Sequence, residues 1–461
     1  MTPRPMLRVN SRLHQRLGAV EIDFLEFAAG AVQRLLPHVE VAAWEEGPWK
    51  ASQSVSTSQK RVEVRMTIAV GTASEPNARS LTTTVRRRGA ANVGGKAKET
   101  IDLREFDICR LITQRITEVL GHQPSLDDTS MQAIRDAFDE YVVASHIQGH
   151  HKLAAPVASV FSALHKLSEQ SYENKALTFG CILDPRKTGQ SSGANFPAEF
   201  LRSKKYKALS DGFRTAYIVS TNGRILGFAD LDRYYKDKDS LTEKHYFPDW
   251  AEAIARSSRK GRCGIALSRQ GDILVFDEGT LRFTYRYGRW QYWNHNHLVN
   301  LLRDRARAQR VPAALAGRVI GAIYRASLDV SFRRSGGLFV ILHNRKDLRQ
   351  IAKDGDAIGD NKRGNTDLEF DNVLKDHTIQ SLPRPVIVEL ASLDGAVVLD
   401  NSGRIRAYGA VLQPRKSGKL RGTEGSRTKA AIGSSNYGLA VKISSDGDIS
   451  VYYKGSEFIR V

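Results

Sequence analysis

LDGAVVLDNSGRIRAYGAVL, residues 393 to 412, contains two apolar runs separated by a turn. Residues 401 to 403 (Asn-Ser-Gly) lie between the runs and are typical of a tight connection between two strands. A plain hairpin carries its acid in the turn, where Asp400 already stands. The additional Asp394-Gly395 ahead of the first run therefore predicts a carboxylate and a bare stretch of backbone at the edge of a pocket.

The same construction occurs a second time, further upstream. TAYIVSTNGRILGFADL, residues 215 to 231, again has an apolar strand, an Asn-containing turn with Gly-Arg-Ile, and a second strand. Residues 262 to 283 also parallel residues 436 to 458, with Gly-Asp-Ile in both turns. The repeated order indicates that the similarity extends beyond a single hairpin.

A third pair of segments completes the repeat. Residues 176 to 183 parallel residues 335 to 342, each an apolar strand after a helical stretch. Three matched pairs in one order predict two tandem modules of a single fold, at about 140–296 and 297–461. The alternative is that unrelated hairpins share a common turn composition.

The chain ahead of the repeats has a different pattern. Helical apolar spacing over residues 10 to 37 is followed by strand patterns between 40 and 100, and a helix is expected at about 103 to 120. Residues 128 to 170 are expected to form two helices that meet near Gly149. The chain is thus predicted to be an α/β (α+β) protein. A small α+β N-terminal domain (1–125), whose role the sequence does not indicate, precedes two modules. Each module is predicted to have a mixed central sheet flanked by helices.

The charge balance favours anionic partners. The chain has 461 residues, with 69 Lys and Arg against 50 Asp and Glu, which gives a formal net charge of +19. Such a surplus suits nucleotides or nucleic acid, although only the net charge supports nucleic acid here. The alternative is a basic surface that keeps the protein in solution.

The remaining composition excludes several protein classes. Three cysteines, far apart and odd in number, indicate neither a disulfide framework nor a zinc ribbon. No apolar segment approaches the ~20 residues of a membrane span, and the N-terminus lacks the apolar core of a signal peptide. We therefore expect a cytoplasmic protein without a membrane partner.

Two clusters of basic residues and histidines resemble binding sites, but their surroundings in the sequence favour ordinary surface features. The basic residues of a Gly-rich loop suit phosphates, but a solvated hairpin tip is favoured. These residues are Arg86, Arg87, Arg88, Lys96 and Lys98. Three histidines have a spacing that suggests a metal site, but no nearby acid or Cys completes the set, so surface histidines are expected. They are His146, His150 and His151.

The last module resembles the diadenylate cyclase domain, of the type found at the N-terminus of the DNA-integrity scanning protein. Four segments carry the resemblance in order: an opening strand, charged turn and short helix; the Asp-Gly-Ala segment; GSRTKAAIG, where the family has Gly-Thr-Arg-His-Arg-Ala-Ala; and a closing hairpin. They are residues 336–358, 393–414, 425–433 and 439–455. The resemblance implies a nucleotidyltransferase that condenses two ATP into cyclic di-AMP and releases pyrophosphate.

The resemblance also implies roles for individual residues. Asp394 would lie at the ribose hydroxyl and bind Mg²⁺ or Mn²⁺, with Asp446 as a second metal ligand. Gly395 and Ala396 would let the backbone approach the nucleotide. The triphosphate would be held by the segment at the start of the Ala-Ala helix, which comprises Gly425, Ser426, Arg427, Thr428 and Lys429. A basic loop ahead of this segment, with Arg415, Lys416, Lys419 and Arg421, adds a positive field.

Several positions depart from the family. Leu393 stands in place of a His, and Lys429 replaces the second Arg of Arg-His-Arg, which keeps the charge but loses the bidentate fork. Residues 434–436 (Ser-Ser-Asn) replace a Ser-Glu pair, and Asp446 alone represents the acids of the closing hairpin. In the upstream module, residues 214–216 (Arg-Thr-Ala) fill the Asp-Gly-Ala position. The upstream copy is therefore expected to be non-catalytic.

Two functions follow from these residues. A cyclic dinucleotide has two phosphodiester bonds, and the family makes them between two facing modules, so an enzyme requires a homodimer of the last module. The alternative is a weak or inactive cyclase-like sensor that binds a nucleotide or cyclic dinucleotide and signals through the N-terminal domain.

Overall fold

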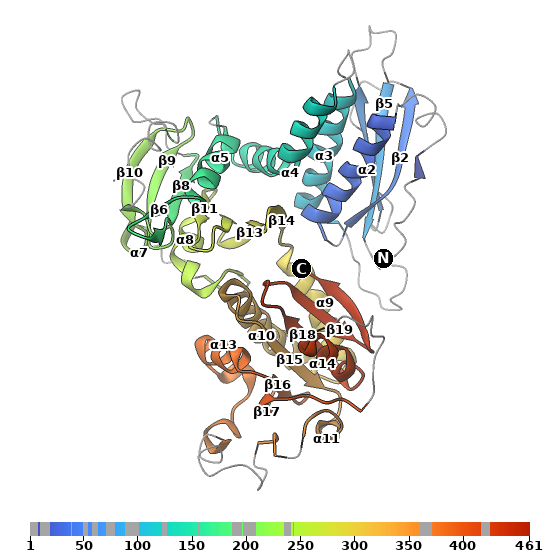
Figure 1. The fold of residues 1–461 in the computed structure, drawn as a ribbon, viewed down its shortest axis with the longest axis vertical. Coiled ribbons are helices and arrows are strands. Elements are labelled where there is room, and N and C mark those ends of the chain that lie inside the picture. Colours follow the sequence, from blue (N-terminus) through green and yellow to red (C-terminus); the bar gives the residue numbers. More distant parts are fainter. Residues whose placement is uncertain are drawn as a thin grey trace. The chain divides into compact units, whose positions relative to one another are not determined.

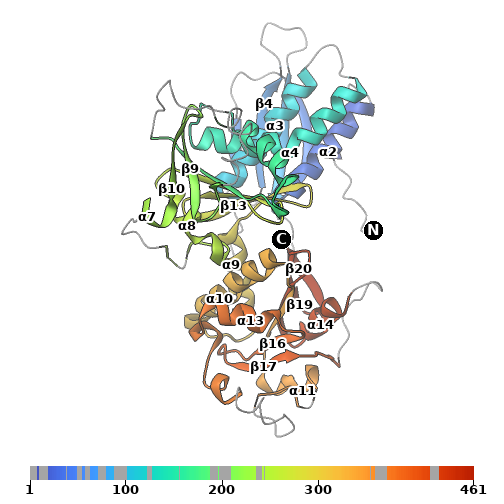
Figure 2. The same cartoon turned by 60° about the vertical axis from the view of Figure 1, so that its left-hand side comes forward.

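The computed structural model describes most of the chain as two compact units. The described residues are 8–9, 19–37, 39–48, 54–57, 63–70, 79–87, 101–121, 127–154, 156–186, 196, 209–234, 241–242, 244–353, 355–358, 371–415 and 425–461. The first unit is Met1–Ser240 with Ala251–Trp293, and the second is Leu241–Trp250 with Asn294–Val461. Figures 1 and 2 show helices and sheets in both units, as expected for an α+β protein.

The first unit begins with a five-stranded sheet of order β1-β2-β5-β4-β3. Its strands are β1 (Arg8–Val9), β2 (Val39–Pro48), β3 (Ser54–Thr57), β4 (Glu63–Val70) and β5 (Arg79–Arg87). Helices α2 (Ala19–Leu35) and α3 (Leu103–Gly121) pack against this sheet and against each other. Periodicity predicted both helices. α3 matches the expected 103 to 120, and α2 lies within the expected 10 to 37, of which residues 10–18 fall outside the described residues.

The basic loop predicted near this sheet is only partly described. Arg86 lies in β5 and its Nε donates to Glu40 Oε1 at 2.7 Å. Arg88, Lys96 and Lys98 lie outside the described residues.

Two further helices follow, as predicted for residues 128 to 170. α4 (Asp128–His150) begins at Asp127, whose side chain accepts a hydrogen bond from the Ser130 N–H at 2.7 Å. α5 (Val157–Ser168) packs against α4. The core of the first unit runs without interruption from the N-terminal helices into the second sheet, because apolar residues of both belong to one buried cluster.

The second sheet has seven strands in the order β10-β9-β8-β11-β12-β13-β14. The strands are β8 (Phe179–Asp184), β9 (Thr215–Ser220), β10 (Ile225–Asp230), β11 (Cys263–Leu267), β12 (Ile273–Asp277), β13 (Thr280–Arg286) and β14 (Arg289–Tyr292). Short pieces accompany it: β6 (Ser171–Tyr172), β7 (Lys175–Ala176), α7 (Leu231–Tyr234) and α8 (Glu252–Ser257). The interior strands β8 and β11 are buried throughout, so this sheet is covered on both faces.

The second unit contains a six-stranded sheet of order β17-β16-β15-β18-β19-β20. The strands are β15 (Gly337–Leu342), β16 (Ala396–Leu399), β17 (Ile405–Ala410), β18 (Gly438–Ile443), β19 (Ile449–Tyr453) and β20 (Ser456–Arg460). The helices are α9 (His295–Ala308), α10 (Ala313–Arg333), α11 (Leu348–Ile351), α13 (Arg384–Ser392) and α14 (Ser426–Ser434). No helix among the described residues combines the length and apolar character needed to cross a bilayer.

The second and third sheets repeat one strand order. β10-β9-β8-β11-β12-β13 corresponds to β17-β16-β15-β18-β19-β20, with β14 as an additional edge strand. In each sheet the second and third of these strands pair in parallel, and all other neighbours pair antiparallel. The matched segments found in the sequence are therefore matched strands.

Equivalent turns also share their hydrogen bonds. The Ser258 and Ser435 hydroxyls each donate to the carbonyl three residues earlier at 2.7 Å. Each hydroxyl also accepts from the N–H of a turn glycine, Gly279 at 3.2 Å and Gly455 at 2.9 Å. In both sheets this serine ties the end of a helix, α8 or α14, to a later hairpin. These contacts support a duplicated module, while the domain limits 1–125, 140–296 and 297–461 stay a prediction.

A buried ion pair holds α13 against α10. The Arg384 guanidinium donates to both carboxylate oxygens of Asp329, at 2.6 and 2.8 Å, and to the Phe247 carbonyl at 2.7 Å. The Asp329 side chain is 2% exposed. Burial raises the pKa of Asp329, and the guanidinium of Arg384 opposes that rise. The pair fixes the start of the helix whose end leads to Asp394.

Arg384→Met is expected to lower the free energy of unfolding by about 3–5 kcal/mol, because it leaves a buried carboxylate without its partner. Urea denaturation measures the change. Arg333→Met is the matched control, because the Arg333 pair with Glu389 is exposed on both sides and such pairs contribute about 0–1 kcal/mol. Equal effects of the two substitutions contradict this role of Arg384.

Candidate functional site

The predicted acid and the predicted phosphate-binding arginine lie side by side. Asp394 follows the end of α13 and precedes β16, while Arg427 is in the first turn of α14. The Asp394 Oδ1 atom is 3.6 Å from Arg427 Nη2. The Asp394 side chain is 99% exposed and that of Arg427 is 33% exposed. A carboxylate open to solvent therefore stands beside a partly buried guanidinium.

A glycine makes room for the arginine. Gly336 has φ +72°, and a Cβ atom there would lie 2.5 Å from Arg427 Nη1. The Nε atom of Arg427 is buried and has no hydrogen-bond partner among the described residues. The guanidinium is thus held close to the start of β15 with donor capacity left over.

Thr428 contacts a third residue, Lys442, whose pKa is also influenced by Asp446. The Lys442 Nζ donates to Thr428 Oγ1 at 3.0 Å. Burial lowers the pKa of Lys442, as does Arg460, while nearby acids that include Asp446 oppose the shift. Asp446 is exposed in the β18–β19 turn. Thr428 therefore has a structural partner, a contact that the sequence did not predict.

Packing within the protein explains why residue 395 is a glycine. Its φ is +113°, and a Cβ atom there would lie 2.4 Å from the Gly409 carbonyl carbon in β17. Ala396 is buried and pairs with Ala410. Close packing of β17 therefore requires Gly395, and the predicted approach of a nucleotide stays a prediction.

The start of α14 offers backbone donors. Gly425 is the residue before the helix and provides no side-chain cap, and Ser426 and Lys429 are exposed in its first turn. No acid occurs in that turn. Free N–H groups at a helix N-terminus suit phosphate oxygens, and Lys429 adds charge. Of the basic loop before it, Lys416, Lys419 and Arg421 lie outside the described residues.

The donor set is compatible with the predicted Mg²⁺ or Mn²⁺. Mg²⁺ is commonly held by one or two carboxylates together with substrate phosphates and water. Asp394 supplies one fully accessible carboxylate. Within the described ranges, neither Asp394 nor Asp446 belongs to a group of three close His, Cys, Asp or Glu side chains. An ion at Asp394 would therefore depend on nucleotide oxygens for most of its ligands.

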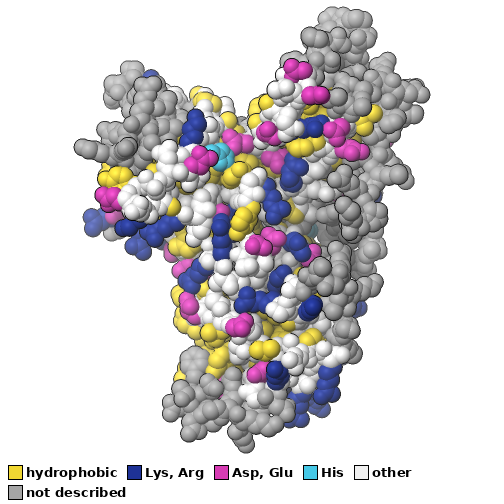
Figure 3. Space-filling view, in the orientation of Figure 1, with side chains coloured by type: hydrophobic (Ala, Val, Ile, Leu, Met, Phe, Trp, Pro, Cys, Tyr) yellow, Lys and Arg dark blue, Asp and Glu magenta, His cyan; other side chains and the backbone are white. Residues whose placement is uncertain are grey.

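A basic cavity of about 1180 Å³ lies in the same unit, beside α11 and the start of β17. Its charged lining has seven cations and two acids: Arg345, Lys346, Arg349, Lys353, Lys375, Arg404 and Arg406, with Asp371 and Asp376. Figure 3 shows Lys and Arg side chains gathered over the region of α11. Arg406 is already paired with Asp400. The remaining surplus of positive charge suits a polyanion.

Sequence reasoning missed this cavity, although a signal was present. HNRKDLRQIAK, residues 343 to 353, places four cations within nine positions. The resemblance of this segment to a cyclase-like domain predicts only a charged turn and a short helix. The cavity lies beyond the C-terminal end of β15, whereas Asp394 lies at the opposite end of the parallel pair β15–β16. The two places are therefore distinct parts of one module.

The upstream module lacks the acid at the equivalent position. The Ser220 N–H donates to the Arg224 carbonyl at 2.9 Å, as the Asp400 N–H does to the Arg404 carbonyl at 3.0 Å. This register aligns Arg214 with Asp394. α8 reads EAIARS and has no Arg-x-Lys at its start. The upstream copy therefore offers neither the carboxylate nor the paired cations.

Comparison with known proteins gives limited similarity. No family model and no curated protein matches the chain. A solved structure of a hypothetical membrane spanning protein from Bacillus cereus is 22% identical with a TM-score of 0.25, over 35% of this chain and 74% of that chain. A double mutant of DacA from Staphylococcus aureus is 22% identical with a TM-score of 0.21, over 31% of this chain and 85% of that chain.

Proposed function

We propose that the module at 297–461 is a diadenylate-cyclase-type nucleotidyltransferase that condenses two ATP into cyclic di-AMP and releases pyrophosphate. The observation that carries this proposal is the approach of Asp394 to Arg427, 3.6 Å apart although 33 positions separate them in the chain. A carboxylate for the sugar and a cation for the phosphates are the two groups that the reaction requires at one place.

The chemistry assigns a step to each group. Asp394 accepts the proton of a ribose 3′-hydroxyl, whose oxygen then attacks the α-phosphorus of the other ATP. The bond between that phosphorus and the bridging oxygen breaks, and pyrophosphate leaves. Arg427, Lys429 and the N–H groups of α14 hold the triphosphate. A bound Mg²⁺ or Mn²⁺ would neutralise phosphate charge beside Asp394.

Two bonds must be made, so two competent modules must face each other. The upstream module has Arg214 where the last module has Asp394, and it is a poor partner for this chemistry. We therefore propose that two copies of the chain associate through the Asp394 and Arg427 faces of their last modules. The nearly complete exposure of Asp394 in the single chain is compatible with such pairing.

Incubation of the purified protein with ATP and Mg²⁺ or Mn²⁺, followed by mass spectrometry, tests this activity directly. Cyclic di-AMP and pyrophosphate are the expected products. Nucleotide binding without product under both metals contradicts the enzyme and leaves the second candidate.

The second candidate is a sensor that binds a nucleotide or cyclic dinucleotide and signals through the N-terminal domain. The basic cavity favours it, because about 1180 Å³ is ample space for a nucleotide-sized ligand. Arg345, Lys346, Arg349 and Lys353 form no ion pair with a described residue in the structure. Positive charge that has no acidic partner among the described residues is suited to phosphate groups.

For the sensor, Arg349→Ala is expected to weaken binding of cyclic di-AMP about 10-fold or more, since a charge-assisted contact contributes roughly 1.5–3 kcal/mol. Calorimetric titration measures the affinity. Arg318→Ala on the exposed face of α10 is the matched control and should leave it unchanged. Unchanged affinity in Arg349→Ala places the ligand elsewhere.

A further inference from the structure

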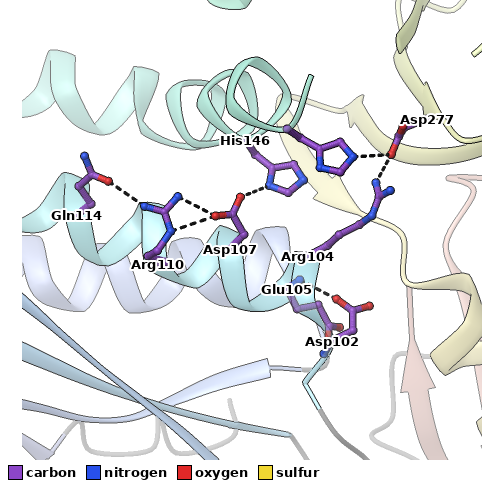
Figure 4. Close-up of polar contacts among 9 residues, drawn as sticks. Asp102, Arg104, Glu105, Asp107, Arg110, Gln114, His146 and Asp277 are labelled. Atoms are coloured by element: carbon purple, nitrogen blue, oxygen red, sulfur yellow. Dashed lines mark hydrogen bonds and ion pairs between the residues drawn. The ribbon is translucent and has the colours of Figure 1, made fainter. Parts of the chain in front are cut away.

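Two histidines and an aspartate of the first unit come together from distant parts of the sequence. His150 ends α4, His151 follows it, and Asp277 ends β12. One ligand atom from each of the three lies within 4.8 Å of the other two. Figure 4 shows the surroundings of Asp277, with Arg104 and His146 nearby. We propose that His150, His151 and Asp277 form a binding site for a Zn²⁺-like metal ion, independent of the nucleotide chemistry proposed above.

This finding corrects the interpretation of the histidines as surface residues. His146 and His151 are buried, and only the His150 side chain, 42% exposed, reaches solvent. No acid was found because Asp277 lies 126 positions beyond His151. Pairing of β12 with β11 brings it back to the end of α4, which local spacing does not reveal.

The distances fit ligands around a metal better than hydrogen bonds. His151 Nε2 is 3.4 Å from Asp277 Oδ1, and His150 Nε2 is 3.6 Å from Asp277 Oδ2. A hydrogen bond between these atoms would be about 2.7–3.2 Å long. Two ligand atoms bound about 2.1 Å from one tetrahedral Zn²⁺ are roughly 3.4 Å apart. The separation between His151 and the Oδ1 atom matches that second geometry, whereas the His150 distance is to Oδ2, the oxygen that Arg104 binds.

The tautomer of His151 also favours a cation in this place. Its Nδ1 lies 2.9 Å from the Gly261 carbonyl oxygen, which can only accept, so Nδ1 carries the proton. In the neutral ring the lone pair of Nε2 then faces the Asp277 carboxylate. A histidine that donates one nitrogen to a carbonyl and presents the other is the usual form of a zinc ligand.

The buried groups have unused capacity for a ligand. Asp277 is 5% exposed at its side chain, and its Oδ1 has no hydrogen-bond partner among the described residues. Nε2 of His146 is likewise buried and without a partner in the described structure. The unsatisfied Oδ1 atom of Asp277 points to a missing ligand within the group that it forms with His150 and His151.

A small cavity of about 10 Å³ lies among these side chains, which matches a single atom-sized occupant. Cys263 also lines it. Cys263 does not belong to the close group formed by His150, His151 and Asp277, so its sulfur is not assigned as a ligand.

The positive charges of two arginines near Asp277 disfavour the binding of a metal cation at this site. Arg104 hydrogen-bonds and forms an ion pair with Asp277 Oδ2, and Arg282 lines the same cavity. Arg104 occupies one carboxylate oxygen and leaves Oδ1 for the ion. The metal must therefore compete with a guanidinium for Asp277, which predicts that removal of Arg104 strengthens metal binding.

The test uses the full-length protein without an affinity tag, dialysed against a chelator and then titrated with Zn²⁺ in a calorimeter. We expect one equivalent of Zn²⁺ per chain. His151→Ala is expected to weaken the affinity at least about 10-fold, the lower limit seen even for residues one step removed from a metal. His165→Ala is the matched control, because His165 lies in α5 paired with Glu140 and should leave the affinity unchanged.

Two further measurements distinguish a loss of metal binding from a loss of folding. Arg104→Met should tighten Zn²⁺ binding, and Co²⁺ added in place of Zn²⁺ should show the visible spectrum of a tetrahedral complex, which His151→Ala loses. No stoichiometric binding overturns the proposal. Equal weakening by His151→Ala and His165→Ala also overturns it, because binding would then reflect surface histidines in general.

Discussion

Asp394→Asn is expected to reduce the formation of cyclic di-AMP by about 10²–10⁴-fold, the range for loss of a group that accepts a proton from the attacking hydroxyl. Asn has the shape of Asp but cannot take that proton. Because the side chain is almost fully exposed, the substitution should not disturb packing. Nucleotide binding should persist, since Arg427 and the start of α14 are unchanged. Product measured by mass spectrometry and affinity measured by calorimetry separate the two effects.

Asp304→Asn is the control for the loss of one exposed carboxylate. Asp304 lies in α9, is 43% exposed, and pairs only weakly with Arg307 at 3.7 Å. It should keep full activity. Retention of product in Asp394→Asn contradicts the role of Asp394, even if the native protein proves to be a cyclase.

Gly395→Ala is expected to destabilise the second unit by about 3 kcal/mol or more, since a left-handed backbone and an overpacked contact each contribute roughly 1–3 kcal/mol. The residue has φ +113°, and the new methyl group would meet the backbone of Gly409 at 2.4 Å. Backbone atoms of a paired strand cannot move aside as a flexible side chain can. Urea denaturation followed by circular dichroism measures the loss.

Gly425→Ala is the matched control within the same site. Gly425 has φ −65°, and no atom lies within 4 Å of an added Cβ. Its expected effect is about 1 kcal/mol or less, the usual range for a change at a helix N-cap. If the two variants are equally stable, the close approach of β17 to Gly395 is not what fixes glycine there.

Local patterns predicted much of the secondary structure. α3 follows from apolar spacing, because a helix that covers one face of a sheet has a sequence period of 3.6 residues. The repeated hairpins follow from turn composition around Gly223 and Gly403, both at positive φ. The order of the strands within each sheet was not predicted, because pairings such as β15 with β18 join segments about 100 residues apart.

The candidate site likewise contains features that the sequence predicted and features that depend on tertiary folding. The resemblance of the last module to the diadenylate cyclase domain predicts that Asp394 and Arg427 share one site, and the two side chains are adjacent in the structure. The reason given for Gly395 was incomplete, because its contact with Gly409 depends on the bulged pairing of β16 with β17. The approach of Asp277 to His151 was missed, since it depends on tertiary folding and leaves no local pattern.

Calorimetric titration with ATP of the native protein and of Arg427→Met tests the central claim most directly. The account predicts saturable binding that Arg427→Met weakens about 10-fold or more, because a charged contact worth roughly 1.5–3 kcal/mol is lost. Arg318→Met, on the exposed face of α10, should bind ATP like the native protein. Native affinity in Arg427→Met would contradict the account, because the triphosphate would then lie away from Asp394 and α14.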